Sequence, residues 1–466
     1  MLGLVAAGVA LRFSTLDLQS FWADEAATVG RVLRPSLWST LGQVGSSEAT
    51  PPLYYVLAWG WTRLLGHSEA GIRSLSALFG TATVPVAWWS ARLLISRAAG
   101  VAAAALVAVS PTMVWYSQEA RAYALLILLS AAGLAFFAQA VRTREPRAVG
   151  WWAVASALAV LAHYFAVFTI APEAVVLAVV LTERRRQVAV AAGAVLAVCA
   201  ALVPLAVHQV NQGHDVWIST IPFRTRLDLL VKQFVFGYNG SSSTAMSVIV
   251  LGSLAGVAAL AAMGLRRAPD WRWWLPLMVG AVTIGVPIAV KVFGHDFFFP
   301  RNVIAAWVPL AVAASVAVAV PRAGAFALAA LCAAFLAMTI AIDATPRLQR
   351  FDWRSAAKAI GPARVPRLVV GPDTGANPLA YYLPHAREVR RGAVAVAEVD
   401  LAWFAAAPGR RPPVLPRPFR AAGSRARAGL LIRRYAAPGG RPVRLDWRRD
   451  VRFAVPGARA ILELPR

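Results

Sequence analysis

The stretch AGAFALAALCAAFLAMTIAI, residues 323–342, contains no charged side chain. An α-helix rises about 1.5 Å per residue, so about 20 apolar residues are enough to cross the hydrocarbon core of a membrane. We therefore expect a membrane-spanning helix here. The whole chain of 466 residues has the same character, because 59% is apolar, only 15% is charged, and the mean hydropathy is +0.59. This composition predicts a polytopic α-helical membrane protein.

Further stretches have the length and apolar character of a span, and they lie at residues 72–95, 98–116, 121–141, 149–163, 165–182, 188–207, 244–265, 273–293 and 302–320. Residues 1–11 are also apolar, but as a helix they would reach only about 16 Å before Arg12, so we count them as a clipped first span. Residues 51–66 begin with two prolines and are rich in Trp and Tyr, which prefer the headgroup level. We expect an interfacial helix there and about eleven spans in all.

Arginines in the short connections between spans set the expected orientation. They cluster near residues 92–97, 142–147, 184–186, 266–272 and 322, which are alternate connections if residues 51–66 do not cross the membrane. Because basic loops stay in the cytoplasm, the remaining polar segments should face outward. These include a first outer loop at 14–71, a long outer loop at 208–243 and everything after 342. We therefore expect a multi-pass protein of the cell membrane whose active site and C-terminal domain are extracytoplasmic.

The composition changes near residue 343 and separates a membrane module, residues 1–342, from a basic domain, residues 343–466. The basic domain holds 24 basic and nine acidic residues, a net +15 of the chain's +25. Short apolar runs beside Gly and Pro turns predict a small α/β domain, with strands near 367–371, 393–399, 430–434 and 460–464 and a short helix through 380–383. Its charge fits an anionic partner such as membrane lipid headgroups or a polyphosphate polymer, and a nucleic-acid role is not favoured.

The two cysteines of the chain, Cys199 and Cys332, both lie inside long apolar runs. A disulfide framework needs several cysteines at exposed, regular spacings, and a structural zinc site needs them clustered. Both kinds of site are therefore excluded.

Two acidic motifs are expected on the outer side. Phe21-Trp22-Ala23-Asp24-Glu25 follows the first span and places two carboxylates at the membrane rim, where carboxylates are costly. Glu119 lies beside the span at 121–141, in the motif Ser117-Gln118-Glu119-Ala120-Arg121-Ala122-Tyr123. Each motif also has a simpler interpretation as a helix start, with Ser117 as the N-cap and Arg121 pairing locally. Two acidic motifs on one face of the membrane favour a functional interpretation.

Basic and aromatic residues recur on the same side. His163-Tyr164 separates two spans, and His208 and His214 lie near the start of the long outer loop, although a lone His at a helix end is usually structural. In that loop Arg224 and Lys232 alternate with aromatic residues, a pattern that suits a phosphate on a lipid tail or an amphipathic surface helix. Arg301 lies at the mouth of the span at 302–320, where a guanidinium group can hold phosphate or snorkel to headgroups.

Outward-facing carboxylates, cations and an aromatic rim are the groups that glycosyl transfer from a lipid-phosphate sugar needs. A carboxylate removes the proton of the acceptor hydroxyl, cations stabilise the departing phosphate, and the membrane supplies the donor. A single base acting in line, opposite the leaving group, implies inversion at the anomeric carbon. We therefore predict an inverting glycosyltransferase that uses a polyprenyl-phosphate-linked sugar and an extracytoplasmic glycan, glycolipid or protein acceptor.

The motifs occur in a definite order: Leu11-Arg12, Ser20-Phe21-Trp22-Ala23-Asp24-Glu25, Pro51-Pro52-Leu53-Tyr54-Tyr55, the Glu119 motif, His163-Tyr164, Arg301 and Phe351-Asp352-Trp353-Arg354. This order resembles the GT-C glycosyltransferases, and in particular the group of protein mannosyltransferases and lipid A aminoarabinose transferases. The resemblance covers about residues 10–360 and implies a GT-C fold.

The resemblance also implies roles for individual residues. Asp24 matches the catalytic base, with Glu25 beside it, and Glu119 matches the second acidic position, which orients the acceptor or, in some members, helps to hold a divalent metal. Arg301 matches a basic residue near the donor phosphate. The remaining candidates for donor and substrate binding are Lys232, Arg224, Arg121, Tyr123, His163, Tyr164, Tyr54 and Tyr55. Thr50 stands where bacterial relatives commonly have His, so no metal site is assigned and metal dependence is not favoured.

Two functions of other classes remain open. A transporter or lipid flippase would place ionisable residues deep in the helix bundle, where the sequence offers only Glu173 and Lys291. Sugar transfer in detergent, without a membrane gradient, would exclude that function. A non-catalytic subunit of a cell-envelope complex would depend on residues 343–466 but would tolerate Asp24→Asn.

Overall fold

The computed structural model describes residues 1–213, 216–240, 243–294, 296–389, 392–404, 415–427, 429–451 and 458–465. The chain forms two compact units. The membrane unit comprises Met1–Leu16 and Leu33–Gln349, and the C-terminal unit comprises Asp17–Val32 and Arg350–Arg466. The segment Asp17–Val32, which carries the first acidic motif, therefore folds with the end of the chain.

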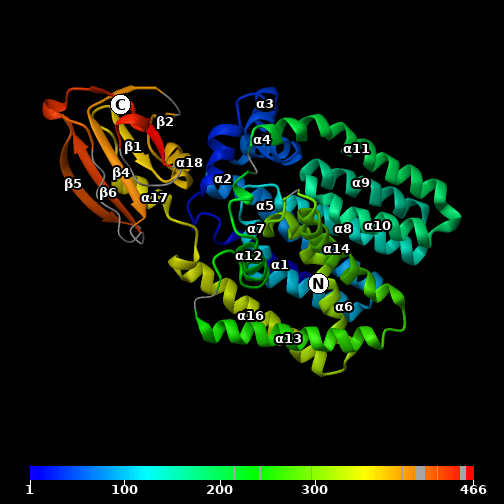
Figure 1. Ribbon diagram of the computed structural model, residues 1–466. Coiled ribbons are helices and arrows are strands. Elements are labelled where there is room, and N and C mark those ends of the chain that lie inside the picture. Colours follow the sequence, from blue (N-terminus) through cyan, green and yellow to red (C-terminus); the bar gives the residue numbers. More distant parts are fainter. Residues whose placement is uncertain are drawn as a thin grey trace. The chain divides into compact units, whose positions relative to one another are not determined.

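The membrane unit is built from helices (Figure 1). They are α1 (Leu2–Phe13), α3 (Leu37–Ser47), α4 (Leu53–Leu65), α5 (Glu69–Leu94), α6 (Arg97–Val109), α7 (Pro111–Ser117), α8 (Tyr123–Thr143), α9 (Pro146–Ala162), α10 (Val167–Val180), α11 (Arg185–Asn211), α12 (Phe223–Phe236), α13 (Thr244–Arg266), α14 (Leu275–Val292), α15 (Trp307–Ala314) and α16 (Ala323–Ala344). Short 3₁₀ turns include η2 (Tyr164–Ala166), η4 (Val216–Ile218), η6 (Pro300–Ala306) and η7 (Ser315–Ala319). Every stretch that the sequence marked as a span contains a helix.

Six helices in the described part of the chain are long and apolar enough to cross a membrane: Tyr123–Thr143, Thr182–Asn211, Thr244–Arg266, Trp271–Lys291, Pro300–Ala319 and Ala323–Ala344. The bent pair α6–α7 makes a seventh if it counts as one span, and shorter apolar helices lie at Leu2–Phe13, Pro146–Ala162 and Tyr164–Val180. The polytopic helical class is thus confirmed. The expected number of eleven spans stays a prediction.

Helices extend into the segment 208–243, where α11 continues to Asn211 and α12 begins at Phe223. Ser117 is not the N-cap of a helix but the last residue of α7, and its hydroxyl donates to the Met113 carbonyl at 2.5 Å. The helix that follows begins only at Tyr123, so Glu119 lies in the connection between the two helices.

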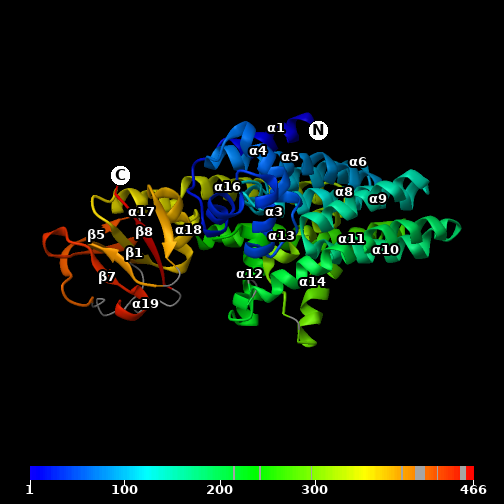
Figure 2. The same ribbon diagram turned by 90° about the horizontal axis from the view of Figure 1, so that it is seen from above.

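Burial distinguishes central helices from peripheral ones. In α8 and in the span Pro300–Ala319, 72% and 78% of the apolar window is buried within the protein, whereas the values for α11 and α13 are 22% and 28%. Leu196, Val203 and Val207 on α11 are correspondingly exposed. Apolar side chains without protein neighbours suit contact with lipid. Figure 2 shows the peripheral α11 beside α9 and α10.

The bend of 58° between α6 and α7 follows from Pro111. Proline has no backbone N–H, so the carbonyl four residues earlier, that of Val107, loses its helical partner. Arg12 replaces that partner: its Nη2 donates to Val107 O at 2.8 Å and its Nη1 donates to Ala108 O at 2.9 Å. Thr339 Oγ1 donates to the next carbonyl, Val109 O, at 2.9 Å. The broken helix is thus satisfied by side chains, as an apolar environment requires.

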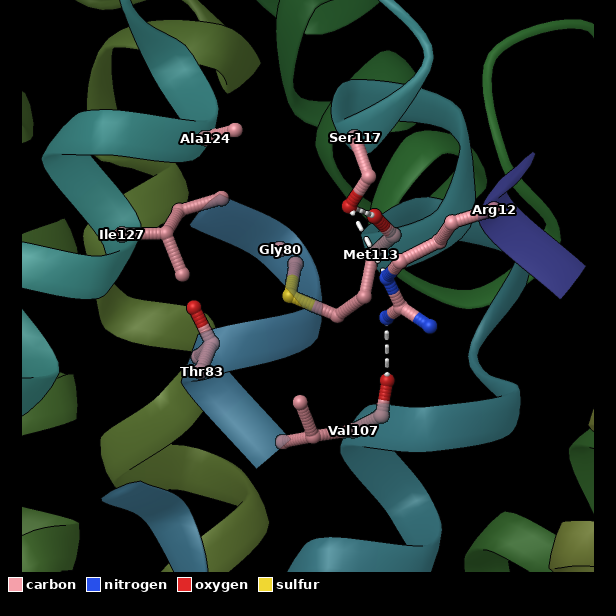
Figure 3. A pocket seen from close by; sticks show the side chains of 8 residues that line it. All are labelled: Arg12, Gly80, Thr83, Val107, Met113, Ser117, Ala124 and Ile127. Carbon is pink, nitrogen blue, oxygen red and sulfur yellow. Dashed lines mark hydrogen bonds between the residues drawn. The ribbon is translucent and has the colours of Figure 1, made fainter. Parts of the chain in front are cut away.

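Figure 3 shows how Arg12 also reaches α7, because its Nε donates to Ser117 Oγ at 3.1 Å. Gly80 on α5 makes this approach possible, since a Cβ there would collide with Ser117 Oγ and lie 3.1 Å from Arg12 Nε. The cavity left between these groups measures about 10 Å³, which leaves no space for a substrate. Arg12 is therefore a structural residue.

The C-terminal unit is the predicted domain with strands. Its main sheet has the order β2-β8-β1-β4-β6-β5 and joins β1 (Arg367–Gly371), β2 (Ala386–Val389), β4 (Glu398–Phe404), β5 (Arg420–Arg427), β6 (Leu430–Ala436) and β8 (Arg459–Glu463). β3 (Val394–Val396) and β7 (Val443–Leu445) form a separate pair, and the helices are α2 (Ala23–Ala27), α17 (Trp353–Ile360), α18 (Asp373–Tyr382) and α19 (Trp447–Asp450). β1 and β4 are parallel, and the other pairs are antiparallel.

A buried ion network joins this sheet to the end of α17. Arg367, which is 1% exposed, pairs with Glu463 at 2.5 Å and with Asp400 at 3.2 Å. Its guanidinium also donates to Ile360 O at 3.2 Å, and Arg434 Nη2 donates to the same carbonyl at 2.9 Å. Buried charges persist only when each is paired and hydrogen-bonded. The network therefore holds the C-terminal end of α17 against β1 and β6.

Replacing Arg12 with Met should destabilise the membrane unit, because the carbonyls of Val107 and Ala108 would lose their partners in an apolar interior. A buried group left unsatisfied costs about 1–3 kcal/mol. We expect a clear fall in the midpoint of thermal unfolding of the detergent-purified protein, while the exposed Arg97→Met, on α6, serves as the control. An Arg12→Met protein as stable as this control would contradict the role of Arg12.

Candidate active site

A cavity of about 360 Å³ lies within the membrane unit. Five of the residues singled out in the sequence line it together: Arg121, Tyr123, His163, Tyr164 and Arg301. Arg121 lies in the connection after α7, and Tyr123 begins α8. His163 and Tyr164 lie between α9 and α10, and Arg301 lies in η6. Aromatic and apolar groups from Trp217, Phe297, Phe165, Phe168 and Val167 complete much of the wall. The cavity therefore combines cations with flat apolar surfaces.

Arg121 is fixed by an ion pair. Its Nη1 lies 2.6 Å from Glu48 Oε2, and both side chains are nearly buried. The Arg121 guanidinium also lies 5.9 Å from the ring centre of Tyr55, whose hydroxyl is 3.2 Å from Thr50 Oγ1. Burial raises the pKa of Tyr55 well above its ordinary value, so this hydroxyl stays protonated. Glu48 thus offsets the charge of Arg121 at one wall of the cavity.

Arg301 is surrounded by aromatic rings. Its guanidinium carbon lies 4.9 Å from the ring centre of Trp217, 5.6 Å from that of Phe299 and 6.0 Å from that of Tyr123. Rings contact the face of a guanidinium group, whereas its N–H groups lie in the plane and are the groups that a phosphate binds. Arg301 therefore brings a cation to an aromatic part of the cavity.

The segment before Arg301 is anchored from α12. Arg226, which is 2% exposed, donates to both carboxylate oxygens of Asp296 at 2.6 Å and to Phe298 O at 2.8 Å. These hydrogen bonds hold the pKa of Asp296 below its ordinary value. Asn302 Nδ2 donates to Phe297 O at 2.8 Å on the other side of Arg301. The polypeptide on both sides of Arg301 is thus fixed by side-chain hydrogen bonds.

His163 is neutral at physiological pH. Burial and the positive charges of Arg121 and Arg301 lower its pKa to about 3. Its Nδ1 accepts a hydrogen bond from the backbone N–H of Phe165 at 3.3 Å, so the ring proton belongs on Nε2. His163 therefore contributes an N–H donor to the cavity wall and no charge.

Sequence reasoning missed several polar residues of this cavity. Gln209 donates to Val44 O at 3.0 Å and to Thr50 O at 3.1 Å, and it accepts from the Tyr164 hydroxyl at 2.9 Å. The available signal for Gln209 was a single amide side chain at the end of the apolar run of α11. Glu48 had none, because its partner Arg121 is distant in sequence.

Other predicted residues lie away from the cavity lining. Arg224 and Lys232 are exposed on α12. Their positions agree with the second interpretation of their pattern, an amphipathic helix at the surface. Tyr54 is fully buried in α4, and Glu119 is buried in the connection that also carries Arg121. His208 lies in the last turn of α11, and His214 lies outside the described residues.

The acidic pair of the C-terminal unit consists of two carboxylates in different environments. Asp24 is partly exposed in the first turn of α2. Glu25 is fully buried, and its Oε2 accepts from the backbone N–H of Trp22 at 3.4 Å, as in a capping box. Glu25 therefore supports the start of the helix, and Asp24 is the more accessible of the two acids.

The chain is similar to known proteins both in sequence and in fold. Residues 49–210 match the model of the dolichyl-phosphate-mannose-protein mannosyltransferase family. The apo structure of ArnT from Cupriavidus metallidurans is similar over 93% of this chain and 97% of that chain, with a TM-score of 0.58 and 13% identity. ArnT from Cupriavidus metallidurans bound to undecaprenyl phosphate is similar over the same shares, with a TM-score of 0.54 and 14% identity. The chain therefore has the fold of ArnT, and residues 49–210 are similar to the mannosyltransferase family.

The GT-C fold and the resemblance that the motifs implied are thus confirmed. No curated protein sequence matches the chain. The helices that are long and apolar enough to cross a membrane agree with this fold. Across the ranges that the structure describes, no three His, Cys, Asp or Glu side chains are grouped so that they could hold a metal ion. The expectation that the protein does not depend on a metal stays a prediction.

Asp296→Asn should weaken the anchor of the Arg301 segment, because Arg226 would keep its charge in a buried position without its carboxylate. A folded-state pKa below the unfolded value of about 3.9 means that this carboxylate stabilises the protein above that value, and that the stabilisation is lost as pH falls through the folded pKa. We expect Asp296→Asn to have a lower unfolding midpoint than wild type at pH 7. Below about pH 4, its midpoint should fall less steeply than that of wild type.

The exposed Asp228→Asn on α12 is the matched control for this carboxylate. Thermal unfolding of the three proteins between pH 3 and pH 7 measures both effects. Equal pH dependence in wild type and Asp296→Asn would contradict the assignment.

Proposed function

We propose that the protein is an inverting glycosyltransferase that moves a sugar from a polyprenyl-phosphate donor to an extracytoplasmic acceptor. The observation that carries this proposal is the cavity of about 360 Å³, which is lined by Arg301 and Arg121 together with aromatic rings and neutral hydrogen-bonding groups. A pocket of this size and mixed character suits a small ligand with one anionic end. A sugar attached to phosphate has that form.

We assign the donor phosphate to Arg301, because its guanidinium group lines the cavity among aromatic rings. Arg121, His163, Tyr164, Gln209 and Asn302 supply hydrogen-bond donors and acceptors suited to sugar hydroxyls. The aromatic rings give a flat apolar surface for the sugar and for the first part of the lipid chain.

Asp24 acts in this proposal as the general base. The acceptor hydroxyl loses its proton to the Asp24 carboxylate while its oxygen forms a bond to the anomeric carbon of the donor sugar. The bond from that carbon to the phosphate oxygen breaks, and the electron pair leaves with the polyprenyl phosphate, whose charge Arg301 stabilises. Attack from the face opposite the phosphate inverts the anomeric configuration. Glu119 takes the second acidic role, orienting the acceptor.

The similarity to ArnT supports the class of donor, because that protein has been solved with undecaprenyl phosphate. Polyprenyl-phosphate sugars reside in the membrane, where the apolar helices of this chain can receive their chains. We place the site and the C-terminal unit on the extracytoplasmic side, in keeping with the distribution of arginines between spans. A glycan, a glycolipid or a protein hydroxyl can serve as the acceptor.

Asp24→Asn should leave the amount of folded protein near normal and reduce sugar transfer by about 10²–10⁴-fold, because the amide cannot accept the acceptor proton. Transfer of radiolabelled sugar from a polyprenyl-phosphate donor by the purified protein is the measurement. Turnover close to that of wild type would refute the base assignment.

Arg301→Gln should weaken donor binding, because one charge-assisted contact to phosphate is lost. Such a contact is worth about 1.5–3 kcal/mol, so the donor KM should rise by about 10-fold or more. Arg224→Gln and Lys232→Gln change the same kind of charge on the exposed face of α12 and should leave KM within about twofold. Equal effects of all three variants would contradict a phosphate site at Arg301.

A further inference from the structure

The acidic motif is tied to the C-terminal unit at the residues that precede it. Ser20 Oγ donates to Phe351 O at 3.0 Å and accepts from Trp353 N at 2.9 Å. The backbone N–H of Phe21 donates to the Tyr382 hydroxyl at 2.7 Å. The Phe21 ring is fully buried and meets the ring of Tyr381 edge-on, with 5.1 Å between centres. The backbone that leads to Asp24 is thus held by α17 and α18.

Asn377 on α18 holds the acidic segment at two points. Its Nδ2 donates to Ala23 O at 3.2 Å, immediately before Asp24. Its Oδ1 accepts from Arg31 Nη2 at 2.6 Å, in the π-helix η1 (Thr28–Val32) that continues α2. One amide side chain therefore joins both ends of the segment to α18.

Arg31 extends this attachment into the sheet. It lies 3.3 Å from Glu388 on β2, and Glu388 is 2.8 Å from Arg459 on β8. Arg459 in turn pairs with Asp373 at the start of α18. Alternating charges thus connect the acidic segment, two strands and α18.

The conformation of α2 depends on these contacts. α2 has five residues, and an isolated helix that short is not stable in water. It continues directly into a π-helix. This conformation is rare in proteins overall, but where it occurs it is often at a functional site. The direction of the Asp24 side chain must therefore be set by the groups that hold the segment.

We infer that Asn377 and Tyr382 are positioning residues for the Asp24 base, so that the C-terminal unit contributes to catalysis by holding the base in place. This inference rests on the proposed function. A general base must lie within about 2.6–3.2 Å of the proton that it removes. A displacement of about 1 Å can reduce the rate by about 10²-fold, so loss of either hydrogen-bonding group should act on turnover.

Kinetics of sugar transfer by the full-length protein test this inference. Asn377→Leu removes both hydrogen bonds of the side-chain amide and keeps a similar volume. Tyr382→Phe removes only the hydroxyl group that accepts the hydrogen bond from the Phe21 N–H. Each should lower kcat by about 10-fold or more and leave the donor KM within about twofold. The exposed Thr374→Ala, on the same helix, should behave as wild type.

A double-variant cycle separates positioning from general damage. In the Asp24→Asn background, Asn377→Leu and Tyr382→Phe should have no further effect, because the base through which they act is gone. The same loss in both backgrounds, or a raised KM with unchanged kcat, would overturn the inference. If Asn377→Leu does not fold, Tyr382→Phe decides by the same criteria.

The pH profile of kcat gives a second readout. A displaced carboxylate has a changed environment, so the acidic limb should shift in Asn377→Leu and Tyr382→Phe, whereas a smaller folded fraction would lower the whole profile without moving it. An unmoved limb would also overturn the inference. Failure of the proposed function has a different result, namely near-normal turnover in Asp24→Asn alone.

Discussion

Backbone carbonyl groups inside a hydrocarbon environment have no water to bind, and one buried guanidinium group meets this demand where α6 and α7 are broken. Pro111 leaves the carbonyl of Val107 without its helical partner, and Arg12 supplies the missing donor. Gln118 completes the arrangement, since its Nε2 donates to the carbonyls of Leu11 and Arg12 at 3.2 Å. The connection that carries Glu119 and Arg121 is therefore held against the end of α1. Without that attachment the cavity would lose one wall.

The electrostatics of the cavity follow from burial. A buried cation is tolerated when it is paired, and Arg121 has Glu48 for that purpose. A buried imidazole beside two guanidinium groups remains neutral, as the low pKa of His163 indicates. Arg301 is held among aromatic faces, which stabilise a cation without neutralising it. The three basic side chains of the cavity thus have different surroundings.

The C-terminal unit has a comparable division between two adjacent acids. Glu25 is buried and caps α2, whereas Asp24 remains accessible one position earlier. Neighbouring residues on a helix point in directions about 100° apart, so one can cap the helix while the other remains accessible. Asn377 and Tyr382 hold the backbone before Asp24 through hydrogen bonds to Ala23 O and from Phe21 N. The C-terminal unit thus orders the segment that carries Asp24.

Composition and apolar length alone predict the membrane class, the helix at each marked stretch and the C-terminal strands β1, β3, β6 and β8, because these properties are local. The sequence also identifies Asp24, Arg121, His163 and Arg301 as candidates, since polar groups at the ends of apolar helices are costly unless they have a role. It does not separate Arg301 from Arg224 and Lys232, or Asp24 from Glu25. Those distinctions depend on which side chains are buried and which partners they meet, as with Glu48 for Arg121 and Asn377 for Ala23. Such partners lie far apart in the chain, and only long-range packing brings them together.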